Sequence, residues 1–336
     1  MSVEMWIYRL LPLATSVIVP LGILLHYWRA ADARPLPAVS DHADAAAWSA
    51  ATRAQLRRAR IASAVVTVAA LASTFGVIVP YRFGTEWNDF LTPLLSALLC
   101  TAVLLARPPA AGGVDTPAAS ADSTAAGGRR GLSTVALGEP WWFIAGALCL
   151  AALVLAVCWA GLASSTDDNG NYTMHSYKFE DVTAGTSIAG WYFGIPVIIA
   201  AVLLTALVLF ALRLQAAPPL AVDGGRDLLL RRAATRTLLS LGVGAVVVTL
   251  AWVLLSIGSA AQLTISVPSA DDGGMTTLDS PLAPISIPAR VLGLLLQGIG
   301  IALLMLPLLS RRAPRAEAAT TEAPTLEHDE AQSATS

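Results

Sequence analysis

Charged residues are scarce in this sequence, at 13% of the chain, about half the share usual in soluble globular domains. Hydrophobic residues make up 55%. The stretch 141–163 contains no Asp, Glu, Lys, Arg or His, and a helix of that length crosses a hydrocarbon core about 30 Å thick. The low charge content excludes an ordinary soluble domain, and the long uncharged stretch predicts a protein that crosses a membrane.

Ionisable side chains are missing from the middle of every long apolar stretch. All 23 acidic residues fall in loops, termini or span edges, and none of the four histidines lies in mid-span. Proton relays and coupling-ion sites need ionisable groups inside the membrane, as do intramembrane proteases that use paired aspartates or a His-Glu zinc site. The pattern therefore argues against an ion-coupled pump and against such proteases.

Cysteine is also rare. Cys100, Cys149 and Cys158 all fall within apolar stretches, where we expect them to act as small packing residues. The formal net charge of −2 argues against a nucleic-acid partner. We expect no cofactor, no metal site and no catalytic residue.

The apolar stretches predict an all-α membrane protein with seven transmembrane helices. The central stretch divides the chain, so the spans are ordered three, one and three, with a first unit at 1–106 and a second unit at 190–309. The first span could instead be a cleaved signal peptide, but its apolar run is longer than a usual signal core and arginines follow it. The predicted spans are 6–28, 61–80, 90–106, 141–163, 190–212, 238–260 and 289–309.

Four other segments connect or follow these spans. Residues 43–60 are rich in alanine, with arginines at helical spacing, and predict an amphipathic helix along the cytoplasmic membrane surface. Residues 107–140 are rich in Pro, Ala, Gly, Ser and Thr and predict a disordered cytoplasmic linker. Residues 164–189 form a polar outer loop, and 310–336 form a disordered acidic cytoplasmic tail.

The basic residues predict the orientation of the chain. Seventeen of the 21 Lys and Arg residues fall in segments that the alternation of seven spans places on one side. Lys and Arg are retained on the cytoplasmic side, so the amino terminus should lie outside and the carboxyl terminus in the cytoplasm. With an odd number of spans, every basic segment lies on the cytoplasmic side at once.

The two long outer loops have the pattern of β-strands. Residues 262–267 alternate between apolar and polar side chains, and Asp-Gly-Gly at 272–274 supplies a turn before 275–278. Residues 172–179 contain Tyr, Thr and Phe and predict a further strand. We expect these strands to form a small β-containing extracytoplasmic cap.

Two similar arginine motifs precede the second and sixth spans. Each reads Arg-Arg-Ala, at 57–59 and at 231–233, as two units that are parallel repeats would. Arg-Arg pairs recur in many membrane proteins, however, and the third spans place their prolines differently, with Pro93 early and Pro307 late, which favours independent recurrence. The same arginines suit anionic lipid headgroups or an acidic partner, although a topogenic role alone also accounts for them. The candidate contacts are Arg53, Arg57, Arg58, Arg60, Arg231, Arg232 and Arg236.

Gln297 is the one strongly polar residue near the middle of a predicted span. It marks either a solute path or an interhelical hydrogen bond worth roughly 1 kcal/mol. A solute path would run near Gln297 and past the spans that Pro12 and Pro196 interrupt.

The outer loop at 167–171 reads Asp-Asp-Asn-Gly-Asn, like the start of a calcium loop. The pattern fails, because Tyr172 stands where glycine is needed and Lys178 where glutamate is needed. A membrane enzyme would need its acid, base or metal within 167–181, where His175 could take part.

Residues 190–196 read Gly-Trp-Tyr-Phe-Gly-Ile-Pro, and an Ala-, Leu- and Val-rich span leads to Ala-Pro-Pro at 217–219. The pattern across 190–236 resembles uncharacterised multi-pass integral membrane proteins of high-GC Gram-positive bacteria. The abundance of alanine and arginine, with Lys178 as the single lysine, agrees with this resemblance. The resemblance implies a plasma-membrane protein and transfers no functional residue. The order of spans also resembles the seven-span sugar transporters, in topology alone, because the second and sixth spans here lack internal prolines.

These observations predict a plasma-membrane protein that acts as a non-enzymatic interaction or accessory subunit. Its partners would be the lipid bilayer and another membrane or cytoplasmic protein. The alternative is a transporter for a small neutral or apolar solute, and a membrane enzyme is the third possibility.

Overall fold

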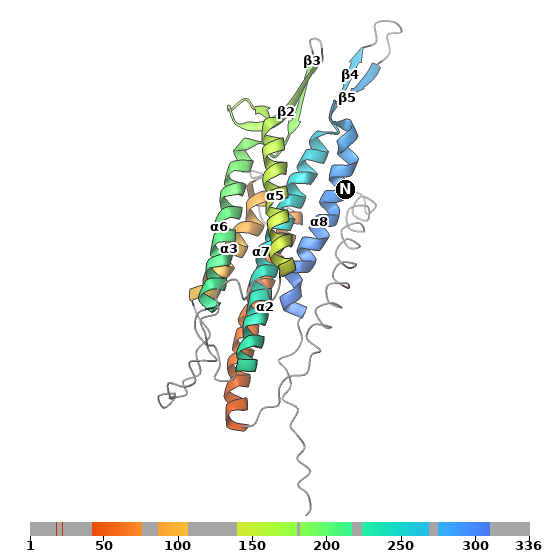
Figure 1. Ribbon diagram of the computed structural model, residues 1–336. Helices are drawn as coiled ribbons and strands as arrows, with labels where there is room; N and C mark the ends of the chain where they lie inside the picture. Colours follow the sequence, from red (N-terminus) through yellow and green to blue (C-terminus); the bar gives the residue numbers. More distant parts are fainter. Residues whose placement is uncertain are drawn as a thin grey trace, which may run out of the picture.

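The computed structural model describes residues 42–75, 87–106, 140–179, 182–216, 224–268 and 275–309, together with positions 18 and 22. Most of these residues are helical (Figure 1). The helices are α2 (His42–Phe75), α3 (Trp87–Ala106), α5 (Pro140–Leu162), α6 (Trp191–Ala216), α7 (Gly224–Ala260) and α8 (Ala283–Leu309). The strands are β1 (Ser165–Thr166), β2 (Tyr172–Phe179), β3 (Val182–Ser187), β4 (Thr264–Pro268) and β5 (Met275–Asp279).

Four of the described helices are long and apolar enough to cross a membrane. They are α5, α6, the Ala233–Ala260 part of α7, and α8, while α3 contains a shorter apolar stretch, Phe90–Leu105. The predicted span 6–28 lies outside the described residues, and the predicted span 61–80 is described only as far as Phe75. The structure therefore confirms four helices that could cross a membrane, as expected of a membrane protein. The count of seven spans stays a prediction.

Two helices begin well before the spans predicted from the sequence. Helix α2 is unbroken from His42 to Phe75, so the structure has one long helix here and not a surface helix that turns into a span. The reason is local, because residues 43–75 are rich in alanine and contain neither glycine nor proline. Helix α7 likewise begins at Gly224, fourteen residues before the span predicted at 238–260.

Helix α7 lies at the centre of the described bundle. It contacts α2, α3, α5, α6 and α8, and 83% of its membrane-length window is buried, against 39% for α6 and 17% for α5. Helices α2, α3, α7 and α8 form a four-helix group in which each helix contacts the next, and α5 and α6 pack outside it (Figure 1). The faces of α5 and α6 that point away from α7 are apolar, as a lipid-facing surface requires.

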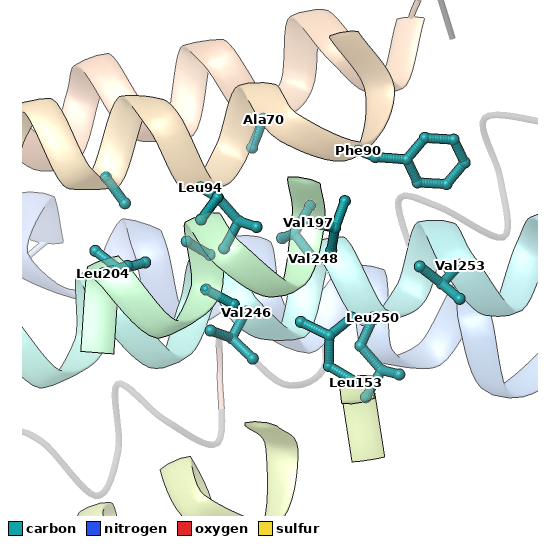
Figure 2. Packing of buried hydrophobic residues seen from close by; sticks show 14 of the residues in the cluster. Ala70, Phe90, Leu94, Leu153, Val197, Leu204, Val246, Val248, Leu250 and Val253 are labelled. Carbon is teal, nitrogen blue, oxygen red and sulfur yellow. The ribbon is translucent and has the colours of Figure 1, made fainter. Parts of the chain in front are cut away.

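Side chains from every one of these helices meet in one apolar core. Figure 2 shows Leu94 of α3, Leu204 of α6 and Val248 of α7 in this core, with Leu153 of α5 nearby. Burial of apolar surface gives little driving force between helices in lipid, since lipid tails are as apolar as leucine. Close van der Waals packing must therefore supply much of the stability.

Helices α7 and α8, which run antiparallel, have the most extensive contact of any two described helices. A methyl group on Gly300 would lie 2.6 Å from Val248 Cγ2 and 3.1 Å from Gly244 O, and one on Gly244 would lie 3.2 Å from Gly300 O. The small residues at this seam recur every seventh position, which is the spacing of a coiled-coil seam. They are Gly244, Ala251 and Gly258 on α7, opposite Gly300, Gly293 and Ser286 on α8.

Side-chain hydrogen bonds add two further links between helices. Ser63 Oγ of α2 donates to Leu304 O of α8. Thr249 Oγ1 of α7 lies 3.4 Å from Phe90 O of α3, as well as 3.0 Å from Ala245 O in its own helix. These links join the members of the four-helix group.

The strands form two separate antiparallel sheets. The strand predicted at 172–179 is confirmed as β2, which pairs with β1 and with β3. The predicted hairpin is confirmed as β4 with β5, in which Ile265 pairs with Leu278. Among the described residues β2 pairs with neither β4 nor β5, so these strands do not share one sheet.

Gly190 joins the first sheet to α6. Ala189 N donates to Ser256 Oγ of α7 at 2.8 Å, and Ile188 N donates to Thr173 O at 2.8 Å. A methyl group on Gly190 would lie only 2.2 Å from Tyr172 O, so no larger residue fits without a backbone shift. This junction fixes where α6 begins relative to β2 and α7.

Candidate functional site

Arginines gather on α2 and α7 near the level at which α8 ends and beyond it. In Figure 1 the amino-terminal parts of α2 and α7 project beyond the ends of α3, α6 and α8 at the same end of the bundle. The two helices also contact each other. All seven arginines predicted as contacts lie on these two helices, and we call them the arginine cluster: Arg53, Arg57, Arg58 and Arg60 on α2, and Arg231, Arg232 and Arg236 on α7.

Two contacts show that both halves of the cluster lie at the same height. The hydrogen bond from Ser63 Oγ to Leu304 O places these two residues at the same height along the bundle. Gly244 packs on Gly300, so Ser240, one turn before Gly244, is level with Leu304, one turn after Gly300. Ser63 and Ser240 therefore mark one level on α2 and α7.

The arginines follow just beyond that level on both helices. At a rise of about 1.5 Å per residue, Arg60 lies about 4.5 Å and Arg236 about 6 Å beyond it. Arg57 follows at about 9 Å and Arg232 at about 12 Å. The two Arg-Arg-Ala triplets, 174 residues apart in the sequence, therefore lie within about one helical turn of each other in height.

The described side chains of the cluster differ in exposure. Arg57 and Arg58 are exposed, Arg60 is half-buried, and Arg236 is 9% exposed. The backbones of Arg53, Arg231 and Arg232 are helical, and their side chains lie outside the described residues. The exposed pair on α2 gives the cluster a face that a charged ligand can reach.

The residues of the predicted solute path are not gathered at one place. Gln297 is 2% exposed in α8, between Gly293 and Gly300 of the α7–α8 seam. Pro196 is half-buried in α6, which continues unbroken past it, so the span that Pro196 was expected to interrupt is a continuous helix. A proline so near the start of a helix removes only one early backbone hydrogen bond. Pro12 lies outside the described residues.

Buried polar side chains are confined to one part of the bundle. Among the described helical residues they belong to α2, α3, α7 and α8, and none belongs to α5 or α6. The hydroxyls of Thr67 in α2 and Thr101 in α3 are buried without a hydrogen-bond partner among the described residues. The four-helix group thus has a partly polar interior.

The loop between α5 and β2 is built around Asp167. The carboxylate accepts hydrogen bonds from Asn171 N at 2.8 Å, Asn169 N at 2.9 Å and Thr173 Oγ1 at 2.9 Å. Gly170 has a φ of 80°, a conformation that favours glycine. The Asp-Asp-Asn-Gly-Asn sequence therefore forms a tight turn that uses both oxygens of Asp167 internally.

His175 lies beside this turn. Its Nδ1 is 3.0 Å from Ala163 O, so that nitrogen carries the proton and donates to the carbonyl. The part of the chain that the structure describes holds no group of three or more His, Cys, Asp or Glu side chains arranged for a metal ion. Glu180 and Asp181 lie outside the described residues.

The hydrogen bonds within the turn lead to a testable prediction about the pKa of Asp167. The backbone N–H of Asn171, followed by Thr173 and Asn169, lowers the pKa of the Asp167 carboxyl below its usual value of 3.8. The carboxylate then stabilises the turn at pH values above the pKa of the unfolded chain, and this contribution is lost as pH falls through the lower pKa of the folded state. In NMR titration of labelled protein, the Asn171 amide signal should shift with a midpoint below 3.8.

Asp167→Asn is the matched control, because an amide oxygen still accepts a hydrogen bond but does not titrate in this range. The shift of the Asn171 signal should disappear in this variant. A midpoint at or above 3.8 in the unsubstituted protein would contradict the prediction.

The α7–α8 seam is the feature that the sequence analysis missed. The sequence analysis did not identify the sevenfold spacing of small residues on both helices. The signal was present, since residues 244, 251 and 258 and residues 286, 293 and 300 are all Gly, Ala or Ser. Only the observed pairing shows which of the many small residues in this chain face a partner helix.

A comparison of the chain with protein-family models, with curated proteins and with solved structures finds no match. Function is therefore inferred from the geometry of the chain itself.

Proposed function

We propose that this chain is a seven-span plasma-membrane protein that acts as a non-enzymatic interaction subunit, and that the arginine cluster is its contact surface. One observation carries the proposal: arginines from two distant segments lie at matched height on two helices that extend past the bundle. Helix α2 is 34 residues long and α7 is 37, or about 51 Å and 55 Å, against a hydrocarbon core of about 30 Å.

The orientation follows from the same surface. We place the arginine cluster and the carboxyl terminus in the cytoplasm, in line with the retention of basic residues there, and the amino terminus outside. The two β-sheets, at the opposite end of the bundle in Figure 1, then form an extracytoplasmic cap. The resemblance to membrane proteins of high-GC Gram-positive bacteria supports the plasma membrane as the location.

The proposal predicts a partner that depends on the cluster. Purification from native membranes in mild detergent, followed by mass spectrometry, should recover a stoichiometric protein partner. Replacing Arg57, Arg58, Arg231 and Arg232 with Gln should reduce recovery of that partner by about tenfold or more, since several charge pairs of up to about 1 kcal/mol each would be lost.

Arg213→Gln is the control for this experiment. Arg213 is an exposed arginine near the end of α6, which lies at the same end of the bundle but outside the cluster. Partner recovery should be unchanged in this variant. A chain that purifies alone, or as a homo-oligomer, would contradict the proposal.

A transporter for a small neutral or apolar solute is the second candidate. The observation that favours it is a pair of buried hydroxyls, Thr67 and Thr101, that have no hydrogen-bond partner within the described part of the chain and lie in the same four-helix group as Gln297. An unsatisfied buried polar group costs about 1–3 kcal/mol, and such groups often contact water or a ligand.

This second candidate predicts that solute flux in proteoliposomes depends on Gln297. Gln297→Leu should lower flux by about tenfold, the effect of losing one hydrogen bond of about 1.4 kcal/mol. Thr205→Val is the control, because the Thr205 hydroxyl donates to Ala201 O within its own helix in the outer layer. Equal flux for Gln297→Leu and the unsubstituted protein would exclude a path at this residue.

A further inference from the structure

The carboxyl end of α8 lies at the height of the arginine cluster. Leu304 is level with Ser63, and α8 ends at Leu309, five residues or about 7.5 Å further on. Arg60 and Arg57 lie about 4.5 Å and 9 Å beyond the same level. Helix α8 also contacts α2 directly. The chain therefore leaves the bundle beside the arginines of α2.

The sequence that follows α8 has a charge opposite to that of the cluster. Residues 316–336 contain five acidic residues and no Lys or Arg. The acidic residues are Glu317, Glu322, Glu327, Asp329 and Glu330. An extended chain spans up to about 3.5 Å per residue, so the eight residues from Leu309 to Glu317 reach about 28 Å. That distance covers the whole cluster.

We propose that the acidic segment 317–330 binds the arginine cluster of its own chain. Both partners belong to one molecule, and a short flexible tether gives a local concentration of about 1 mM. Weak ion pairs between exposed side chains are then sufficient for substantial occupancy, although each is worth little alone. The tail pairs with the exposed arginines Arg57 and Arg58.

The consequence is a competition for one surface. The tail covers the arginines that a protein partner would use, so it tunes access of that partner to the cluster. This regulatory role rests on the proposed function, whereas binding of the tail to the cluster is measurable without any partner. Anionic lipid headgroups are the competing occupant of the same arginines.

The test uses a fluorescent synthetic peptide of residues 316–336 and the protein reconstituted in nanodiscs of zwitterionic lipid. A chain truncated after Arg315 should bind the peptide, whereas the full chain, whose own tail occupies the cluster, should bind it at least about tenfold more weakly. Arg57→Gln with Arg58→Gln, in the truncated chain, should weaken binding about fivefold to tenfold. Raising the ionic strength from about 0.05 M to about 0.5 M should weaken it as well, because salt screens exposed charges.

Two controls test whether the binding depends on the charges of the tail and of the cluster. Arg213→Gln in the truncated chain should leave binding unchanged, and a peptide with its five acidic residues changed to Gln or Asn should not bind. Equal binding to the truncated and full chains, or binding indifferent to Arg57 and Arg58, would overturn the proposal. So would loss of binding in nanodiscs that contain phosphatidylglycerol, because lipid would then be the occupant.

The outcome is distinguishable from that of the proposed function. If the peptide does not bind but recovery of a partner still depends on the arginines, the proposal that the tail binds the cluster is overturned and the proposed function is not. If the peptide binds but no protein partner is recovered, the proposed function as an interaction subunit is overturned and binding of the tail is not.

Discussion

Gly300→Val is expected to lower the free energy of unfolding of the helix bundle by about 3 kcal/mol, which is at the upper end of typical overpacking costs. A Cβ at this position would lie 2.6 Å from Val248 Cγ2, 2.9 Å from Val248 N and 3.1 Å from Gly244 O. Two of these three atoms belong to the backbone of α7, so the clash cannot be relieved by a rotamer change. The helices must separate, and α7 is the helix on which the other described helices pack.

The measurement is unfolding by increasing SDS in mixed micelles, followed by tryptophan fluorescence. Gly242→Ala is the control on α7, since its new methyl group would meet only the side chain of Val208, with Cγ2 at 3.2 Å and Cγ1 at 4.0 Å. Alanine also favours a helix over glycine by up to about 1 kcal/mol, so this control should be close to neutral or slightly stabilising. Equal stability of the Gly300 and Gly242 variants would show that the α7–α8 seam is not closely packed.

Gly190→Ala is expected to destabilise the protein by about 3 kcal/mol or more, although only one methyl group is added. That methyl group would lie 2.2 Å from Tyr172 O and 2.6 Å from Ser164 Cβ. The first of these atoms belongs to the backbone of β2, and the second lies on the segment that leads out of α5. Relief of the clash therefore requires α6 to move away from the sheet and from the end of α5.

Gly185→Ala is the control for this junction. A methyl group there would lie 2.6 Å from Met174 Cε, the end of a flexible side chain that can turn aside. Its stability in the same SDS titration should differ from that of the unsubstituted protein by less than about 1 kcal/mol. If both glycine variants lose stability equally, the close contact between Gly190 and Tyr172 is not the cause.

Local sequence patterns predicted much of the helical and strand structure. The uncharged stretch 141–163 corresponds to α5 at Pro140–Leu162, and the predicted strand 172–179 corresponds to β2. In both cases the signal is local: the length of an uncharged run in the first, and residue type in the second. The helix predicted at 43–60 corresponds to the first part of α2, but no turn separates it from the following apolar stretch. Helix α7 likewise begins before the span predicted at 238–260, because charged residues end an apolar run without ending a helix.

The candidate site was predicted in part. The arginines were identified from their charge and spacing, but their common height depends on the contacts of Ser63 with Leu304 and of Gly244 with Gly300. No pattern within α2 or α7 contains that information. The sequence does not decide whether Gln297 belongs to a solute path or to an interhelical contact, and its position beside the α7–α8 seam is a property of packing alone.

The sequence by itself determined that this is a membrane protein, where its apolar helices lie and where charge accumulates, since these follow from the cost of placing charges in hydrocarbon. The tertiary structure alone decided that α7 is the central helix and that its small residues face those of α8. The physical reason is that a helix apolar on all sides has no preferred face in its sequence. Which face is buried depends on close fit between backbones, and that fit exists only when both helices are present.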